Sequence, residues 1–195
     1  MKAYKTPSLT VKEYMDHEIA SNTKHEYHDG KIYALAGGTV NHGKISGNVY
    51  SELRNQLKNK ESSCLPFNSD VKLFIESSNS YVYPDSMVVC AEEESDEDKH
   101  FVTNPVIIVE VLSKSTAAYD RGDKLYLYRG IPSFKEYVLI EQDKYVVDVH
   151  YKHKDSDLWS LTRYEGIDKI VKFQSLDIEI SMEDLYFRTN ITAPL

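Results

Sequence analysis

The fold of this chain is decided by one stretch, Pro105-Val106-Ile107-Ile108-Val109-Glu110-Val111-Leu112. Apart from Glu110 the run is apolar, and it is shorter than an ordinary helix. A continuous apolar run of this length is typical of a strand that is buried on both faces, at the centre of a sheet covered by helices. Glu110 therefore stands where a carboxylate is costly unless it is protonated, paired or bound to a cation.

The segments on both sides of this run alternate between helical and strand patterns. An apolar residue at every fourth position predicts a helix over residues 41–58, namely at Ile45, Val49, Leu53 and Leu57. Asp29-Gly30 predicts the tight turn of a hairpin between strands at 26–27 and 31–33. The remaining periodicities and turn signals predict helices over 11–19 (capped by Ser8 or Thr10), 120–129 and 182–186, and strands over 70–76, 81–90, 136–140, 145–151, 159–164 and 170–173. This order predicts an α/β layered domain with a central sheet, and because no repeat or linker divides the chain, we expect residues 1–195 to form a single domain.

The composition is that of an ordinary globular chain with a surplus of acids. Its 195 residues are 41% hydrophobic and 28% charged, with a net charge of −8. Six of the acids lie within residues 92–98, which we expect to be an exposed loop, and outside this segment 23 basic residues face 25 acidic ones. The acidic balance argues against a nucleic-acid partner, because phosphate binding depends on Lys and Arg, but the near-neutral remainder permits a basic face.

The chain carries no signal for secretion or for a membrane span. No apolar run approaches the roughly 20 residues of a membrane helix, and the N-terminal lysines are not followed by an apolar segment. Cys64 and Cys90 are too few for a disulfide framework or a zinc cluster. We therefore expect a cytoplasmic protein with reduced cysteines and no membrane partner.

Asp85 is a second carboxylate in an apolar setting. It precedes the strand-like run Ser86-Met87-Val88-Val89-Cys90. If Asp85 and Glu110 lie on neighbouring strands, they can converge on one hard cation, since Mg²⁺ prefers oxygen ligands and retains water. The alternative is that one of them ends its strand in solvent while the other forms an ion pair. Lys124, early in the helix expected at 120–129, can orient a water molecule or stabilise charge on a phosphate, or it can be an ordinary surface lysine.

Several of these segments, taken together at their spacing, resemble the putative restriction endonuclease family of the PD-(D/E)xK superfamily, a family abundant in photosynthetic bacteria. The match runs from about residue 8 to 187. It is carried by Tyr83-Pro84-Asp85, Val109-Glu110-Val111-Leu112-Ser113, Tyr119-Asp120-Arg121-Gly122-Asp123-Lys124-Leu125 and Gly130-Ile131-Pro132, and in the N-terminal half by residues 24–33 and Asn41-His42. The resemblance implies a restriction-endonuclease-like core, in which helices flank a central mixed β-sheet.

The resemblance also implies a metal site. Carried over residue by residue, it makes Asp85 and Glu110 the ligands of Mg²⁺ or Mn²⁺. The superfamily pattern has a lysine two positions after the second acid, where this chain has Leu112. The related family is thought to move this lysine to the next helix, and Lys124 matches that place. Lys114 is nearer in sequence and ranks second.

Two further residues enter through the resemblance. Glu26 stands where the family pattern carries an additional acid, and the alternative is an exposed strand charge. His42 is a candidate for phosphate contact or proton transfer, and the alternative is a helix cap or another structural role. Asp70 either supports the site from behind or is a strand-end charge. Three tyrosines are expected to pack in the core, namely Tyr126, Tyr128 and Tyr137.

The leading hypothesis is a metal-dependent endonuclease that hydrolyses DNA phosphodiester bonds, with a two-fold homodimer suited to duplex cleavage. A second hypothesis is a catalytically degenerate nuclease-fold protein that binds nucleic acid or regulates, which Leu112 and the acidic net charge favour. A third is a structural homo-oligomer that assembles through its tyrosine-rich strands.

Overall fold

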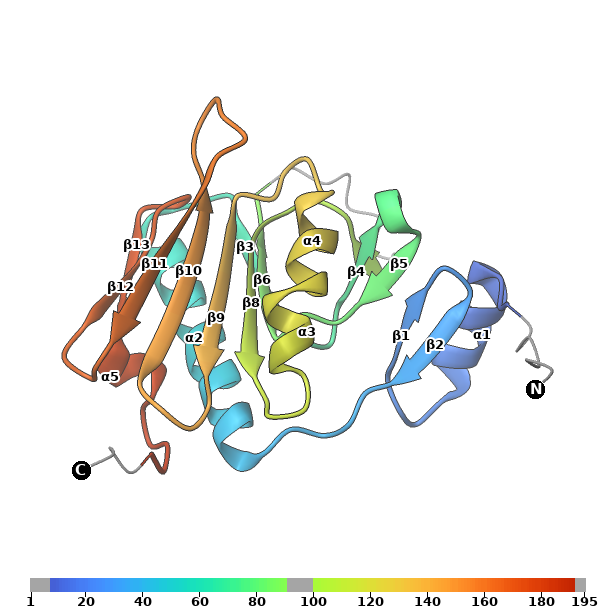
Figure 1. Ribbon diagram of the computed structural model, residues 1–195, viewed down its shortest axis with the longest axis horizontal. Helices are drawn as coiled ribbons and strands as arrows, with labels where there is room; N and C mark the ends of the chain where they lie inside the picture. Colours follow the sequence, from blue (N-terminus) through green and yellow to red (C-terminus); the bar gives the residue numbers. More distant parts are fainter. Residues whose placement is uncertain (1–7, 91–99, 192–195) are drawn as a thin grey trace.

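The computed structural model describes residues 8–90 and 100–191. Its helices are α1 (Val11–Ala20), α2 (Val40–Asn59), α3 (Ala117–Arg121), α4 (Asp123–Arg129) and α5 (Met182–Leu185), with a short 3₁₀ turn η1 (Glu76–Ser78). Its strands are β1 (His25–His28), β2 (Lys31–Ala34), β3 (Leu65–Asn68), β4 (Lys72–Ile75), β5 (Ser80–Val82), β6 (Ser86–Val89), β7 (Phe101–Val102), β8 (Pro105–Leu112), β9 (Glu136–Glu141), β10 (Val146–Lys152), β11 (Trp159–Glu165), β12 (Ile170–Phe173) and β13 (Ile178–Ser181). Figure 1 shows their arrangement.

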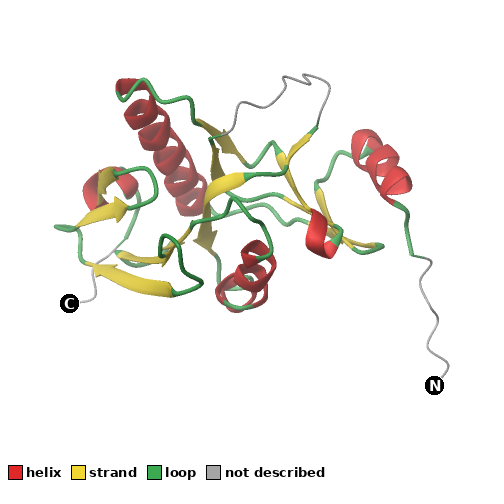
Figure 2. Ribbon diagram, turned by 90° about the horizontal axis from the view of Figure 1, so that it is seen from above, coloured by secondary structure: helices red, strands yellow, loops and turns green. Residues whose placement is uncertain are grey.

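Strand β8 is the buried centre of the larger sheet, as its apolar sequence predicts. All of its residues are buried, and it pairs antiparallel with β6 and parallel with β9. This mixed six-stranded sheet has the order β11-β10-β9-β8-β6-β3, beside a five-stranded sheet of order β2-β1-β5-β4-β7 and a β12-β13 ribbon. Helix α2 covers one face of the larger sheet, while α3 and α4 cover the other (Figure 2). The predicted α/β architecture is confirmed.

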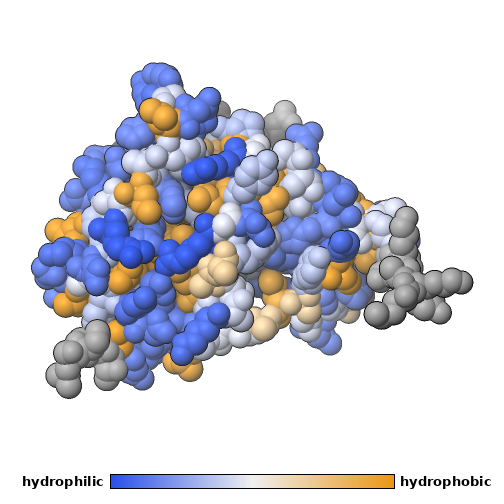
Figure 3. Space-filling model, in the orientation of Figure 1, coloured by the Kyte–Doolittle hydropathy of each residue, from blue (hydrophilic) through white to orange (hydrophobic). Residues whose placement is uncertain are grey.

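The surface on the side of α3 and α4 is mostly hydrophilic, and its apolar residues form separate patches (Figure 3). Within residues 8–90 and 100–191, no helix has the length and apolarity that crossing a bilayer requires. The acidic segment at residues 92–98, predicted to be an exposed loop, lies outside the described residues.

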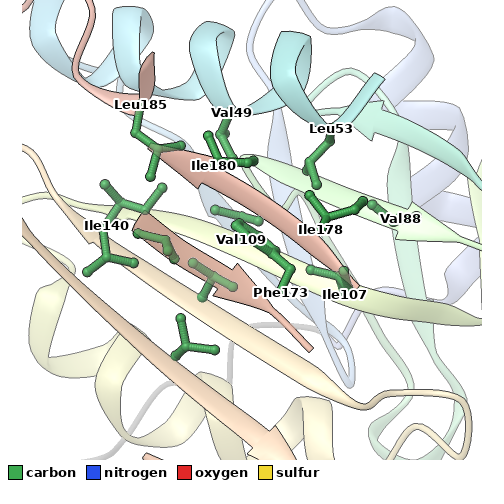
Figure 4. Packing of buried hydrophobic residues seen from close by; sticks show 14 of the residues in the cluster. Val49, Leu53, Val88, Ile107, Val109, Ile140, Phe173, Ile178, Ile180 and Leu185 are labelled. Carbon is green, nitrogen blue, oxygen red and sulfur yellow. The ribbon is translucent and has the colours of Figure 1, made fainter. Parts of the chain in front are cut away.

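Helix α2 follows the predicted pattern closely. Its four-residue stripe is fully or almost fully buried against the sheet and the β12-β13 ribbon. In Figure 4, Val49 and Leu53 of α2 point toward Ile178 and Ile180 of the ribbon. Each such buried aliphatic side chain contributes about 1.5–3 kcal/mol. This packing fixes the helix, and therefore its first turn, which carries His42.

The predicted hairpin is also present. Asp29 (φ 42°) and Gly30 (φ 92°) both have positive φ, as a tight two-residue hairpin turn requires. A side chain at position 30 is excluded for a second reason, because a Cβ there would lie 1.7 Å from Ser8 Oγ. Strand β1 also pairs with β5, so the hairpin is part of the five-stranded sheet and carries Glu26 into it.

Two predicted elements are wrong in their boundaries. The strand expected over 81–90 is two strands, β5 and β6, that belong to different sheets. The chain crosses between them at residues 83–85, where Pro84 has no N–H for a strand hydrogen bond. The helix expected over 120–129 is divided at Gly122 into α3 and α4. Tyr126, expected in the core, is 80% exposed, whereas Tyr128 and Tyr137 are buried as predicted.

The expectation of reduced cysteines is wrong. Strand β3 was not predicted, and it pairs with β6 so that Leu65 lies opposite Val89. This register places Cys64 beside Cys90, and the two form a disulfide.

Candidate active site

The five residues singled out from the sequence lie around one cavity of about 1260 Å³, namely Glu26, His42, Asp85, Glu110 and Lys124. Residues 34–43, which lead from β2 into α2, form one wall of this cavity. Residues 110–111 and 113–116, at the end of β8, form another. The surface is hollowed where the loop from β2 crosses to α2 (Figure 3). Asp85 and Glu110 therefore face the same space and do not point to opposite sides of the sheet.

Asp85 is held through one of its two oxygens. Its Oδ2 accepts a hydrogen bond of 2.7 Å from the backbone N–H of Val111, and it lies 3.2 Å from His42 Nε2. Because β6 and β8 are paired neighbours, the residue before β6 reaches the backbone of β8 directly. Oδ1 of Asp85 has no hydrogen-bond partner among the described residues, so it is available to a ligand in the cavity.

Glu110 is held in the same manner. The hydroxyl of Tyr128 donates to its Oε1 at 2.7 Å, and Lys124 Nζ lies 2.8 Å from the same oxygen. Oε2 of Glu110 has no hydrogen-bond partner in the part of the chain that the structure describes. Burial raises the pKa of Glu110 above its usual value, against the opposing effect of the Lys124 ammonium.

Lys124 is buried in the site and is not the surface lysine of the alternative interpretation. It is only 6% exposed, and its Nζ lies 3.7 Å from both Glu26 Oε1 and Asp120 Oδ1 in addition to Glu110. Burial alone lowers the pKa of Lys124, but the three carboxylates outweigh burial and raise this pKa well above its usual range. The side chain is therefore a charged ammonium group.

Glu26 is also part of this buried cluster, and the alternative of an exposed strand charge is wrong. Its carboxylate contacts Lys124 and His28 and accepts a long hydrogen bond of 3.4 Å from the N–H of Tyr83. Burial alone raises the pKa of Glu26, but the charge of Lys124 and the contacts with His28 and Tyr83 outweigh it and hold this pKa below its usual value.

His42 lies in the first turn of α2, beside Asp85. The hydrogen bond with Asp85 raises the pKa of His42, and partial burial opposes this effect. The backbone of Gly38 packs against the imidazole ring, since a Cβ on Gly38 would lie 2.8 Å from Nδ1. The helix cap is Thr39, whose hydroxyl accepts a hydrogen bond from the backbone N–H of His42, so the His42 side chain does not serve as the cap.

The other candidates lie differently. Asp70 is not among the residues that line the cavity, and its exposed carboxylate pairs with Lys24 at 2.6 Å, which agrees with a strand-end charge. Lys114 lines the cavity wall beyond the end of β8. Leu112 is 2% exposed and packs in the core beneath α4, so its side chain is excluded from the cavity.

Two residues that contact the candidate site residues, Asp120 and Tyr128, were not predicted from the sequence to do so. Asp120 is 3% exposed, and its four-residue separation from Lys124 was the available signal that they share a face. Tyr128 was expected in the core, where it is, but nothing in the sequence indicates that its hydroxyl reaches Glu110.

The donor atoms in the cavity fit a hard divalent cation whose coordination shell is completed by water and substrate. Across the described residues, no group of three or more His, Cys, Asp and Glu side chains is arranged to hold a metal ion. Mg²⁺, however, is usually bound by one or two carboxylates, with water and substrate phosphate as its remaining ligands. Asp85 and Glu110 offer one such oxygen each.

Comparisons with known proteins identify the family of this chain. Residues 11–183 match the family described as putative restriction endonuclease. Two uncharacterized Synechocystis proteins, slr1290 and sll1609, are similar to this chain at 35% identity over 180 residues and 36% over 174. These matches cover 92% and 89% of this chain, and 92% and 97% of the two relatives.

The crystal structure of a putative nuclease from Anabaena variabilis is similar to this structure with a TM-score of 0.71 at 18% identity. The similarity covers 91% of this chain and 97% of that chain, and it shows a shared fold. The protein thus has a restriction-endonuclease-like fold and belongs to the putative restriction endonuclease family.

Proposed function

We propose that this protein is a Mg²⁺- or Mn²⁺-dependent endonuclease that hydrolyses phosphodiester bonds in DNA. The observation that carries the proposal is the pair of carboxylates, Asp85 and Glu110, that line one cavity. Within the described residues, each keeps one oxygen without a hydrogen-bond partner. The buried ammonium group of Lys124 lies beside them. Membership of the family supports the same chemistry.

Each residue has a distinct task in this proposal. Asp85 and Glu110 hold the cation, which when bound lowers the pKa of a coordinated water and neutralises charge on the phosphate. Lys124 orients the attacking water or stabilises the negative charge that develops on the phosphate. Glu26 holds the Lys124 ammonium in place, and His42 supports Asp85 through Oδ2.

A second candidate is a nuclease-fold protein that binds nucleic acid without cleaving it. Leu112 favours this candidate, because the superfamily pattern has its lysine there and Leu112 is enclosed in the core. Lys124 opposes it, since an ammonium group already lies 2.8 Å from Glu110. Calorimetric titration with Mn²⁺ separates the two, because a degenerate site binds the ion feebly.

The test compares Asp85→Asn and Glu110→Gln with Glu136→Gln. Glu136 is a matched control: it is fully buried, its carboxylate accepts hydrogen bonds from the backbone of Gln174 and Ser175, and it does not line the cavity. Single-stranded and duplex DNA are incubated with each protein, with Mg²⁺, with Mn²⁺ and with a chelator. We expect cleavage by the parent and the control only with a divalent ion, and none by the two site variants.

Cleavage that survives in both site variants, or that needs no divalent ion in the parent, contradicts the proposal. Absence of cleavage by the parent together with weak Mn²⁺ binding favours the second candidate. We further propose a two-fold homodimer, because one site per chain then suffices to cut both strands of a duplex. Light scattering of the parent protein measures this, and a monomeric mass contradicts it.

A further inference from the structure

The ring of Tyr128, near the end of α4, is tightly packed in the core. It is fully buried, and its centroid lies 5.8 Å from that of Phe134 and 5.4 Å from that of Tyr137. Close-packed interiors leave such a ring little freedom to shift. The position of its hydroxyl is therefore set by the core, and in the described part of the chain that hydroxyl has one partner, Glu110 Oε1.

This hydroxyl makes the two oxygens of Glu110 unequal. Lys124 alone does not do so, because an ammonium group has three rotatable donors and can follow a carboxylate that turns. Tyr128 offers a single donor at a fixed point, 2.7 Å from Oε1. With Tyr128 and Lys124 on the same oxygen, Oε2 is the oxygen left for a ligand in the cavity.

We propose that Tyr128 is a positioning residue that holds Glu110 by Oε1 and so presents only Oε2 to a divalent cation, an inference that rests on the proposed function. Asp85 is constrained in a parallel way. The N–H of Val111 and the ring of His42 both engage its Oδ2. Each ligand of the proposed pair is thus tied through one oxygen, and Tyr128 supplies on Glu110 the fixed donor that the backbone supplies on Asp85.

The variant that tests this is Tyr128→Phe, which removes the hydroxyl and keeps the ring. Tyr186→Phe is the matched control, since Tyr186 is 3% exposed, donates its hydroxyl to Glu141 O and Val146 O, and does not line the cavity. Mn²⁺ binding is measured by electron paramagnetic resonance without DNA, and cleavage is measured across a Mn²⁺ series. Groups that orient metal ligands typically contribute 10–100-fold in affinity.

We expect Tyr128→Phe to bind Mn²⁺ about tenfold more weakly, and to recover most of the parent cleavage rate at saturating Mn²⁺, because Lys124 is still in place. Tyr186→Phe should match the parent. Unchanged Mn²⁺ affinity in Tyr128→Phe overturns the inference. So does a loss of the cleavage rate at saturating Mn²⁺, which indicates a direct role of Tyr128 in the reaction instead of positioning.

A second measurement needs no tyrosine variant and keeps the inference testable if Tyr128→Phe does not fold. Infrared difference spectra on Mn²⁺ addition are compared between the parent and Glu110→Gln. A wide splitting of the Glu110 carboxylate stretches indicates ligation through one oxygen and supports the inference, whereas a narrow splitting indicates ligation through both oxygens and overturns it. Mn²⁺ bound at Glu110 without DNA cleavage contradicts the proposed function alone, so the two failures are distinguishable.

Discussion

Replacing Gly38 by alanine tests how far Asp85 depends on His42. A Cβ at position 38 would lie 2.8 Å from His42 Nδ1 and 3.0 Å from its Cγ, whereas ordinary contacts begin at 3.4 Å. Something must therefore shift, and the His42 ring, which supplies the nearest atoms, is the group that we expect to move. We expect this movement to lengthen the 3.2 Å contact between His42 Nε2 and Asp85 Oδ2 beyond hydrogen-bonding range.

The magnitude follows from what Asp85 loses. A hydrogen bond to a charged group is worth about 1.5–3 kcal/mol, and each 1.4 kcal/mol corresponds to a factor of ten in an equilibrium constant. Asp85 keeps its bond from the Val111 N–H, so we take the lower end of this range. Gly38→Ala should weaken Mn²⁺ binding and slow cleavage at limiting Mn²⁺ by about tenfold.

Gly37→Ala is the control for this change. It lies in the same loop, neither glycine has a positive φ, and nothing lies within 4 Å of a Cβ at position 37. Both variants restrict the unfolded chain equally, so their difference isolates the contact with His42. The assay is a Mn²⁺ titration, with the ring signals of His42 followed by NMR.

Two results would refute this reasoning. If the ring signals of His42 move only in Gly38→Ala but both variants bind Mn²⁺ like the parent, Asp85 does not depend on His42. If the ring signals do not move in Gly38→Ala, the close approach of Gly38 does not constrain the imidazole.

Three further predictions concern stability. Cys64→Ser opens a disulfide that spans 26 residues. The loss should lower the free energy of unfolding by about 3.5 kcal/mol through loop entropy and the Tm by roughly 10 °C. Calorimetry with and without reductant checks this, and a parent protein whose Tm is the same in both conditions contradicts it. Burial alone raises the pKa of Asp148, but the hydrogen bonds from two arginines outweigh it and hold this pKa below its usual value. The ionised carboxylate therefore stabilises the fold above about pH 4. Asp148→Asn should lower the free energy of unfolding in urea at pH 7, and its difference from the parent in this free energy should shrink as the pH falls below about 4. A difference that does not change with pH contradicts this. Leu53→Ala, at a fully buried position of α2, should cost about 2–5 kcal/mol in urea unfolding without altering Mn²⁺ affinity in the folded protein, and a cost under about 1 kcal/mol is the contrary result.

Local pattern was sufficient for the parts of the fold that depend on neighbours in sequence. The four-residue stripe of α2, the Asp29-Gly30 turn and the apolar run of β8 all have the structure that their periodicity or turn chemistry predicts. The energetic cost of Glu110 within an apolar strand also indicated a site, because a buried carboxylate needs a partner.

Contacts between segments that are distant in sequence could not be predicted from local sequence patterns. Strand β3 contains Pro66, which weakens any strand signal, and without β3 the adjacency of Cys64 and Cys90 is invisible. Tyr126 and Tyr128 look alike in sequence, yet one faces solvent and the other reaches Glu110. The rotation of a seven-residue helix about its axis decides this difference, and so short a helix carries little periodicity to reveal it.

The single ammonium of Lys124 spans two architectural units, because Glu26 arrives on the five-stranded sheet and Glu110 on the six-stranded one. One counter-charge thereby links the two sheets. Substitutions at Glu26 and Glu110 share this one counter-charge, so their effects on stability should not sum. A double-mutant cycle on the two residues measures this coupling between the sheets.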